Sequence, residues 1–206
     1  MTEISRVALF GKLNSVGYKA VEGATVFCKM RGNPYVEVIH WFQQILQGQD
    51  SDLHRIIQHF DMDPSKVAKD MVAALDALPR GASSISDLSD HLENTVERAW
   101  VYASLALKSP AVRTGHLVLG MAKTGGLKNV LIGMTGEFAK VKADELLDDF
   151  DEICGGSPED GLGPQDGTAI GAGAGAVPGE ASGAMAPAGM GKEEALQQFC
   201  KDLTAQ

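Results

Sequence analysis

Cysteine is scarce in this sequence of 206 residues, and its three copies lie far apart. Cys28, Cys154 and Cys200 are odd in number and form no C-x-x-C pair. A disulfide framework needs paired cysteines, and a zinc knuckle needs closely spaced ones. The sequence therefore indicates neither, and we interpret all three as reduced thiols.

Clusters of basic residues are also absent. The formal net charge is −9, and the 18 lysines and arginines are scattered, whereas acidic residues gather in 144–160. Nucleic acids and anionic membranes bind through clustered positive charge, so neither is an expected partner. Residues 1–10 contain no apolar run of signal-peptide length, and no stretch approaches a membrane span. We expect a soluble, cytoplasmic protein.

The chain lacks a nucleotide-binding loop. The segment "GMGKEE" near the C-terminus places glycines before a lysine, as a Walker A loop does. In that loop, however, a Ser or Thr follows the lysine and binds Mg²⁺, and another glycine leads the motif. Here Glu193 follows Lys192, and Ala186 stands at the leading position. We therefore expect no ATP, Mg²⁺ or other cofactor in this chain.

Signatures of other catalytic centres are missing as well. The sequence has no G-x-S-x-G elbow and no H-E-x-x-H pair. His54 and His59 are five residues apart, which places them off a shared helical face. His40 and His116 occupy similar positions near two expected helix starts, and we interpret them as structural. We predict no catalytic residues and no metal site, so this chain is not expected to be an enzyme.

Apolar residues recur at helical spacing from residue 4 to 150, and the interruptions carry helix-capping residues. Gly32 is a typical helix stop, and Asn33-Pro34 and Asp63-Pro64 each offer an N-cap and a first-turn proline. Thr114 and Thr135 are further candidate N-caps. No segment sustains the period of two that is typical of a strand. The sequence predicts an all-α domain of eight or nine helices over residues 1–150.

The helical region repeats itself. Residues 13–29 align with 92–108 at an offset of 79, and the same offset places 35–41 on 114–120. After a five-residue deletion, residues 65–71 align with 139–145. Three blocks in the same order indicate a duplication. We predict two similar four-helix repeats that pack about a pseudo-two-fold axis and share one core.

The composition changes after residue 150. Residues 151–191 are rich in Gly, Ala, Pro and acid, with too few large apolar groups to offset the entropy of ordering. We predict a flexible, disordered linker there. A helical pattern returns in 192–206, but a helix this short is marginal alone. We expect it to be the first element of a module outside this chain.

Four helical segments carry a family resemblance: "LFGKLNSVGYKAVEGATVFCKMRGNPYVEVIHWFQQILQ", "DSDLHRIIQHF", "LPRGASSISDLSDHLE" and "VERAWVYASL". The two repeats resemble the Clp N-terminal domain, which precedes the ATPase rings of Clp-type AAA+ unfoldases. The wording of these segments is similar to the ClpV branch, the unfoldase of bacterial type VI secretion. The terminal "FCKDLTAQ" is similar to the segment that enters the first ATPase module. The resemblance covers 4–150 densely and 199–206 thinly.

This resemblance implies a docking domain. The ATPase rings of this branch disassemble the contracted secretion sheath. Their N-terminal domain binds a helix near the N-terminus of the larger sheath subunit in a hydrophobic groove. An added first helix, here "EISRVALFGK", helps to form that groove in the family. The full-length parent is expected to be an ATP- and Mg²⁺-dependent hexamer that assembles through its ATPase modules.

The residue pattern of the first helix agrees with a docking role. Its apolar stripe is narrow and has small members, which lets another helix approach closely. At the offset of 79, Leu9 falls on Leu88, so the segment 85–92 is its counterpart, with a stripe of its own. The alternative that both stripes only seal the domain stays open. The predicted partner-binding residues are Ile4, Val7, Ala8, Gly11, Ile85, Leu88 and Leu92.

Other functions also stay open. A ClpB-like disaggregase has the same kind of domain, but the added first helix and the wording of the segments disfavour it. A small independent enzyme would need a convergent nucleophile or metal set. A stand-alone helical scaffold would not need a linker that ends in a partial module.

Overall fold

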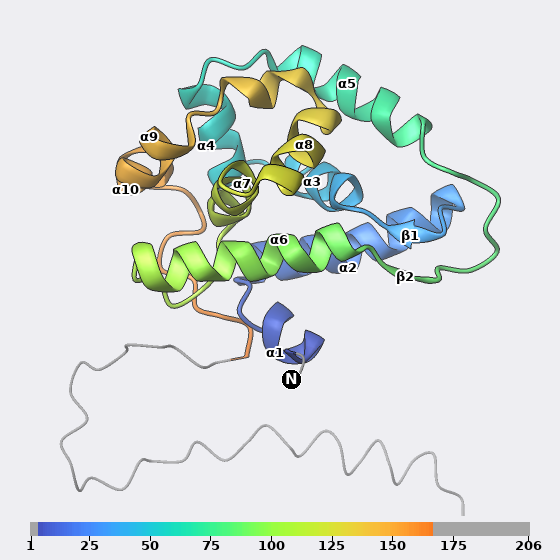
Figure 1. Ribbon diagram of the computed structural model, residues 1–206, viewed down its shortest axis with the longest axis horizontal. Coiled ribbons are helices and arrows are strands. Elements are labelled where there is room, and N and C mark those ends of the chain that lie inside the picture. Colours follow the sequence, from blue (N-terminus) through green and yellow to red (C-terminus); the bar gives the residue numbers. More distant parts are fainter. Residues whose placement is uncertain (1–3, 167–206) are drawn as a thin grey trace, which may run out of the picture. The chain divides into compact units, whose positions relative to one another are not determined.

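The computed structural model describes residues 4–166 and is drawn in Figure 1. This part is mainly helical, which confirms the predicted all-α class. The first half contains α1 (Arg6–Phe10), α2 (Ser15–Arg31), β1 (Tyr35–Val36), α3 (Val38–Leu46), α4 (Asp52–His59) and α5 (Pro64–Asp76). The second half contains β2 (Asp87–Leu88), α6 (Asp90–Val101), the π-helical turn η1 (Tyr102–Ala106), α7 (Thr114–Ala122), α8 (Gly125–Met134), the 3-10 turn η2 (Gly136–Lys140), α9 (Ala143–Asp148) and α10 (Phe150–Cys154).

Local capping chemistry accounts for several helix ends. Gly32 ends α2 in the left-handed conformation at φ 69°, and Asp63 caps α5 ahead of Pro64 by accepting from two backbone N–H groups. Thr135 accepts from the N–H of Glu137 and caps η2. These positions agree with the sequence prediction, because each signal acts within a few residues.

Two predicted N-caps are wrong. The helix after Asn33 begins only at Val38, with Glu37 as its N-cap, and Thr114 lies inside the first turn of α7. In both helices the N-cap N–H donates to a histidine three residues later. The N–H of Glu37 donates to Nδ1 of His40, and the N–H of Arg113 donates to Nδ1 of His116. Both hydrogen bonds are 3.0 Å long. Each histidine side chain therefore satisfies the N–H of the N-cap residue, as the N3 residue of a capping box does.

Short parallel pairings relate the two repeats. Leu13, which precedes α2, pairs with Val112, which precedes α7. Residues 35–36, which precede α3, pair with 87–88, which precede α6. Each pairing thus joins the start of the first helix of one repeat to the start of the second helix of the other. This exchange is what a pseudo-two-fold axis between two repeats produces.

The equivalent caps correct the alignment of the repeats. Asn14 and Ser89 cap the first helices and differ by 89 − 14 = 75 residues. Glu37 and Arg113 cap the second helices and differ by 113 − 37 = 76. The sequence offset of 79 is therefore wrong by about one helical turn. Residues on one helix face recur every three or four positions, so a one-turn slip keeps apolar residues on apolar residues.

One continuous hydrophobic core runs through both repeats. Trp41, Phe42 and Leu53 from the first repeat are fully buried with Leu117 and Phe138 from the second. The Trp41 ring is fixed at its polar end by a 3.0 Å hydrogen bond from Nε1 to the Gly17 carbonyl. The phenyl rings of Phe42 and Phe138 meet edge to face. Neither repeat buries its apolar face alone, so the two fold as one unit.

The domain continues past residue 150, where the sequence predicts the start of a flexible linker. Helix α10 buries Ile153 and Cys154, and the turns that follow bury Ser157 and Glu159. The prediction is therefore wrong for residues 151–166. We call residues 155–166 the strap. The remainder of the predicted linker, 167–191, and the predicted helix in 192–206 lie outside the described residues.

The two capping histidines make the fold pH-sensitive. Burial, with a contribution from Arg31, lowers the pKa of His40 to about 4, and burial also lowers the pKa of His116 to about 3. Both rings accept a backbone N–H at Nδ1, which a protonated ring cannot do. In the unfolded chain a histidine becomes protonated near pH 6.5, whereas in the folded domain these two stay neutral to a lower pH. The folded state is therefore fully stabilised by the neutral histidines above pH 6.5, and this stabilisation is lost as the pH falls toward 4.

We expect His40→Gln to flatten this dependence. Between pH 7 and pH 5, protonation linked to His40 should lower the unfolding free energy of the wild-type protein by about 2 kcal/mol. The total loss over this pH range should be smaller in the variant by the same amount, about 2 kcal/mol. Urea unfolding followed by circular dichroism at the two pH values measures the difference. Equal losses in the two proteins would show that His40 does not carry this linkage.

Candidate docking surface

Helix α1 combines a buried side with an exposed apolar side. Leu9 and Phe10 are only 7% and 8% exposed and insert into the core, whereas Val7 is 84% and Ile4 62% exposed. In Figure 1, α1 lies below α6, on the side of the molecule opposite α5. A five-residue helix has no stability of its own, so its place depends on these contacts. The exposed apolar side is therefore presented by an anchored helix.

An exposed ion-pair cluster links α1 to the start of the second repeat. The Arg6 guanidinium contacts both carboxylate oxygens of Asp87, at 2.6 and 3.1 Å, and the Glu93 carboxylate at 2.5 Å. The hydrogen bond from Arg6 lowers the pKa of Asp87. The cluster places α1 beside β2 and the first turn of α6, so the structure brings together the two segments that the sequence singled out. The alignment of the repeats, which is wrong by one helical turn, does not predict the ion pairs of Arg6 with Asp87 and Glu93. Arg6 is not among the predicted partner-binding residues.

The seven predicted residues have three different environments. Val7 and Ala8 are exposed on α1, and Ile4 is exposed just before its N-cap, so all three are available to a partner. Ile85 and Leu88 are half-buried and pack against the core. Gly11 and Leu92 are buried, Leu92 completely, so neither presents a side chain to a partner. The prediction is wrong for these last two, and the other five remain candidates.

Gly11 is small for a reason that the sequence could not show. It ends α1 in an ordinary right-handed conformation, so no positive φ requires glycine there. A Cβ added at Gly11 would lie 2.9 Å from the Val7 carbonyl oxygen of α1 and 3.0 Å from the Cβ of Asp166 in the strap. The missing side chain therefore makes room for the backbone of α1 and for the end of this domain's own chain.

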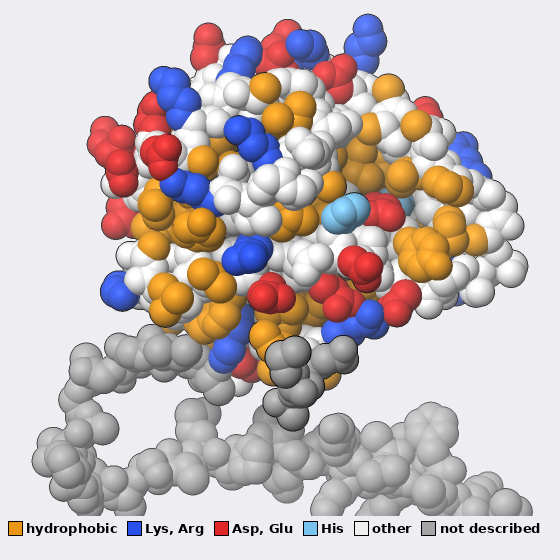
Figure 2. All heavy atoms as spheres, viewed as in Figure 1, with side chains coloured by type: hydrophobic (Ala, Val, Ile, Leu, Met, Phe, Trp, Pro, Cys, Tyr) orange, Lys and Arg blue, Asp and Glu red, His pale blue; other side chains and the backbone are white. Residues whose placement is uncertain are grey.

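The surface seen in Figure 2 consists of separate hydrophobic patches divided by charged side chains. A cavity of about 540 Å³ lies between α3, α4 and α5, and another of about 370 Å³ lies between α6 and α8. None of the seven predicted residues lines either cavity. The predicted residues of α1 thus lie outside these two cavities.

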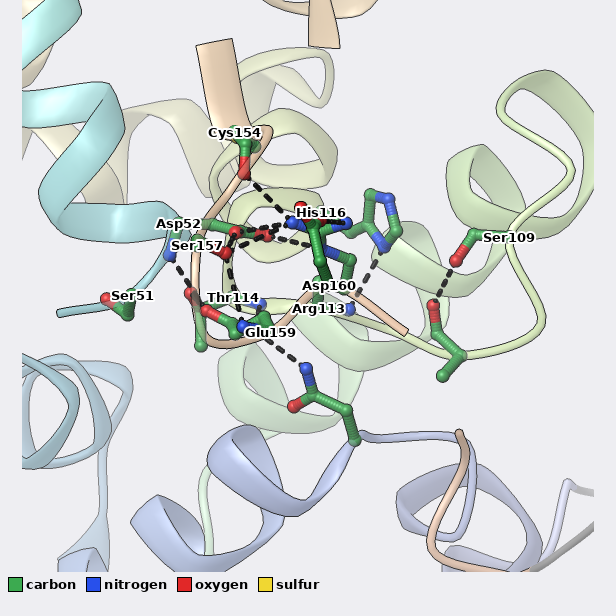
Figure 3. Close-up of polar contacts among 12 residues, drawn as sticks. Ser51, Asp52, Ser109, Arg113, Thr114, His116, Cys154, Ser157, Glu159 and Asp160 are labelled. Atoms are coloured by element: carbon green, nitrogen blue, oxygen red, sulfur yellow. Dashed lines mark hydrogen bonds and ion pairs between the residues drawn. The ribbon is translucent and has the colours of Figure 1, made fainter. Parts of the chain in front are cut away.

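A buried polar cluster joins the strap to both repeats, as Figure 3 shows. The Glu159 carboxylate accepts hydrogen bonds from the N–H of Asp52 and the N–H of Thr114, both at 2.8 Å, and from the Asn14 amide at 2.7 Å. These donors lie at the first turns of α4 and α7 and at the N-cap of α2. Helix N-termini favour negative charge, so one carboxylate holds three helix starts together.

Arg113 completes this cluster. Its guanidinium binds both carboxylate oxygens of fully buried Asp52, at 2.7 and 2.8 Å, and contacts Asp160 of the strap at 2.6 Å. It also donates to the Cys154 carbonyl at 3.1 Å. Burial and the nearby Asp52 carboxylate raise the pKa of Glu159, and burial raises the pKa of the Cys154 thiol. Asp52, Ser157 and Glu159 are buried, Asp160 is exposed at the edge, and the carboxylates of Asp52 and Glu159 are held by hydrogen bonds within the domain, so we interpret the cluster as structural.

The described part of the chain offers little other chemistry. Between residues 4 and 166, no group of three or more His, Cys, Asp or Glu side chains is placed to hold a metal ion. Over the same residues, no helix combines the length and the apolar character needed to cross a membrane. The exposed apolar side of α1 is the candidate docking surface.

The family of the chain follows from its repeats. The family described as Clp repeat (R) N-terminal domain matches residues 14–134, which is more than half of the sequence. The chain belongs to this family. The match begins after α1, so the first helix lies outside the part that this Clp N-terminal domain shares with the family as a whole.

Two curated relatives match almost the whole of this Clp N-terminal domain. The AAA+ ATPase ClpV1 of Pseudomonas aeruginosa is 60% identical over 206 residues, which is 100% of this chain and 22% of ClpV1. The chaperone protein ClpB of Yersinia enterocolitica is 43% identical over 203 residues, 98% of this chain and 22% of that protein. The chain thus spans about a fifth of the length of these relatives.

Solved structures agree with the fold. One comes from work on the coevolution of the ATPase ClpV, the TssB-TssC sheath and the accessory HsiE protein in two type VI secretion classes. It is 60% identical, with a TM-score of 0.76, and the match covers 78% of this chain and 99% of that one. A complex of a ClpV N-domain with a VipB peptide is 22% identical, with a TM-score of 0.65, and the match covers 74% of this chain and 93% of that one. The latter shows a likeness of fold alone.

Proposed function

We propose that this chain is the substrate-docking domain of a ClpV-like AAA+ unfoldase and binds a helix near the N-terminus of the larger type VI sheath subunit. The observation that carries the proposal is the exposed apolar side of α1 on a helix anchored by Leu9, Phe10 and Arg6. The 60% identity to ClpV1 over the whole chain supports the same assignment. The docking residues in this proposal are Ile4, Val7 and Ala8, with Ile85 and Leu88 beside them.

The remaining parts of this function lie outside the chain. ATP and Mg²⁺ would bind in ATPase modules of the full-length protein, which would assemble as a hexamer in the cytoplasm. Nucleic acid and membrane are not partners in this proposal, because the net charge is −9 and the basic residues are dispersed. A short helix in an apolar site binds with a Kd of about 1 μM, and six tethered copies would raise the apparent affinity through avidity.

Substitution of Val7 tests the docking surface. We expect Val7→Asp to weaken binding of a labelled peptide from the N-terminus of the larger sheath subunit at least about tenfold, because a charge would face an apolar helix. Fluorescence anisotropy measures the Kd. Val72→Asp is the matched control, since Val72 is also exposed, at 51%, but lies on α5. Equal weakening by both substitutions, or none by Val7→Asp, would contradict the assignment to α1.

A ClpB-like function is the second candidate, and the 43% identity to a protein named ClpB is the observation in its favour. In that role the domain would handle aggregated proteins and not one sheath helix. Binding of a permanently unfolded protein with the same Kd as the sheath peptide would favour this candidate. The higher identity to ClpV1 makes it the weaker of the two.

A further inference from the structure

The contacts of the strap with the chain just after α1 form a junction at residues 11–13. The N–H of Asp166 donates to the Gly11 carbonyl at 3.0 Å, and the N–H of Gln165 donates to the Leu13 carbonyl at 2.9 Å. The side chains of Lys12 and Asp166 form an ion pair at 2.9 Å. On the other side of the same residues, the N–H of Val112 donates to the Lys12 carbonyl at 2.7 Å. The link between α1 and α2 is thus held between the second repeat and the strap.

These bonds act where α1 most needs partners. The last carbonyl groups of a helix receive no hydrogen bond from within the helix, so they need donors from elsewhere. The Gly11 carbonyl, at the C-cap of α1, finds its donor in the strap. Because α1 has only five residues, few of its backbone bonds are internal, and its orientation depends on contacts of this kind.

The strap is itself fixed at its other end. Glu159 is fully buried and bonded to the starts of α2, α4 and α7, and Asp160 is paired with Arg113. Between this clamp and Asp166 there are only a few residues. A firm anchor at Glu159 therefore limits where Asp166 can lie, and Asp166 in turn limits where Gly11 and the end of α1 can lie.

We propose that the strap positions α1 for partner binding, with the close contact between Gly11 and Asp166 as the positioning contact. The inference rests on the proposed docking function. It assigns a role to residues 155–166 that goes beyond closing the domain: the chain that leaves the second repeat sets the orientation of the docking helix. The two helical repeats alone would leave that orientation to Arg6 and to the burial of Leu9 and Phe10.

Hydrogen exchange in the full chain tests the proposal. Gly11→Ala keeps a conformation that alanine adopts freely, but it places a methyl group 3.0 Å from the Cβ of Asp166 and 2.9 Å from the Val7 carbonyl oxygen, so Asp166→Ala, described below, isolates the strap side of this contact. We expect the amides of residues 6–13 to exchange about tenfold faster and the sheath peptide to bind about tenfold more weakly. Gly133→Ala is the matched control, because Gly133 also lies in a helix end and a Cβ there meets no atom within 4 Å.

A second pair of variants removes the ion pair without adding volume. Asp166→Ala loses the contact with Lys12, whereas Asp144→Ala loses an exposed ion pair with Lys123 elsewhere. We expect about threefold faster exchange of residues 6–13 in the first variant only, since exposed pairs contribute little. These experiments use mass spectrometry on intact folded protein, and circular dichroism reports whether the helical content is retained.

The outcomes separate this inference from the docking function. Unchanged exchange of residues 6–13 in both Gly11→Ala and Asp166→Ala, with faster exchange in the strap, would overturn the positioning role. Faster exchange of residues 6–13 in a protein whose wild type binds no sheath peptide would support the strap and overturn the docking function. Faster exchange of residues 6–13 in Asp166→Ala as well as in Gly11→Ala, together with weaker peptide binding, supports both, whereas faster exchange in Gly11→Ala alone is explained by the Val7 carbonyl and overturns the positioning role.

Discussion

Replacing Arg113 with methionine is expected to lower the free energy of unfolding by about 3–5 kcal/mol. Methionine keeps much of the arginine stem and its packing over the Phe150 ring, which the guanidinium faces at 5.7 Å. It removes the only positive charge that we find bonded to Asp52 among residues 4–166, and Asp52 has no exposed surface. The variant would therefore retain a buried carboxylate without its cation, which is the costly way to break a buried ion pair.

The loss reaches beyond one pair. Arg113 also donates to the Cys154 carbonyl and the Ser157 hydroxyl, and it contacts Asp160. These three acceptors belong to the end of α10 and to the strap, so the variant weakens the attachment of residues 154–160 as well. Urea unfolding at pH 7, followed by circular dichroism, measures the change.

A matched control and a second variant sharpen this test. Arg80→Met also removes an arginine bound to an aspartate, Asp76, but that pair is exposed, and we expect a loss under about 1 kcal/mol. Adding Asp52→Asn to Arg113→Met removes the unpaired charge and should restore part of the stability. A loss for Arg113→Met as small as that for Arg80→Met would show that the cluster does not hold the domain together.

Much of the fold was predictable because its signals are local. The Asp63-Pro64 pair and Gly32 each determine a helix end through contacts within four residues, and the structure has those ends. The duplication was also detectable, since whole helices repeat. Its register was not, because a one-turn slip still matches apolar residues with apolar residues. The paired caps, Asn14 with Ser89 and Glu37 with Arg113, fix the register, and their equivalence is visible in three dimensions.

The candidate site was predictable in part for a similar reason. A helical stripe tells which residues share a face, and Val7 and Ala8 are exposed together on α1, with Ile4 exposed just before it. The stripe does not predict which distant part of the chain covers one end of that face. Gly11 belongs to the same stripe but lies beneath Asp166, which is 155 residues later in the sequence because 166 − 11 = 155. No local pattern reports a contact of that separation.

The sequence predicts a disordered linker in place of the strap because that prediction rests on the number of large apolar side chains. Residues 155–166 have few of them, yet one carboxylate, Glu159, bonds to groups on three helices. A buried polar group that satisfies several helix starts at once substitutes for apolar burial. The sequence "GGSPEDGLGPQD" contains nothing that distinguishes this acid from one in a solvated linker.

A chain that ends at residue 150, the boundary that the sequence predicts, is expected to be at least about 5 kcal/mol less stable than one that ends at residue 166. The shorter chain loses the buried side chains of Ile153 and Cys154, and it leaves Asp52 and Arg113 without their partners in the strap. Apolar burial of this kind contributes about 1.5–3 kcal/mol for each large side chain, and each buried polar group left without a partner costs about 1–3 kcal/mol.

A loss of that size equals the whole stability of many domains of this length, so the chain 1–150 should be largely unfolded at 25 °C. The chain 1–166 should unfold at the same urea concentration as the full chain, because it keeps every described contact of the strap. Urea unfolding of all three chains separates the effect of residues 151–166 from that of chain length, because the chain 1–166 is also shortened but keeps the strap. If 1–150 unfolded at the same urea concentration as 1–166, the bonds of Glu159 would contribute nothing net, and the domain would end at α9 and the first residue of α10. If it does not fold, the end of the chain belongs to the core as much as the helices do, because Glu159 bonds to three of their starts.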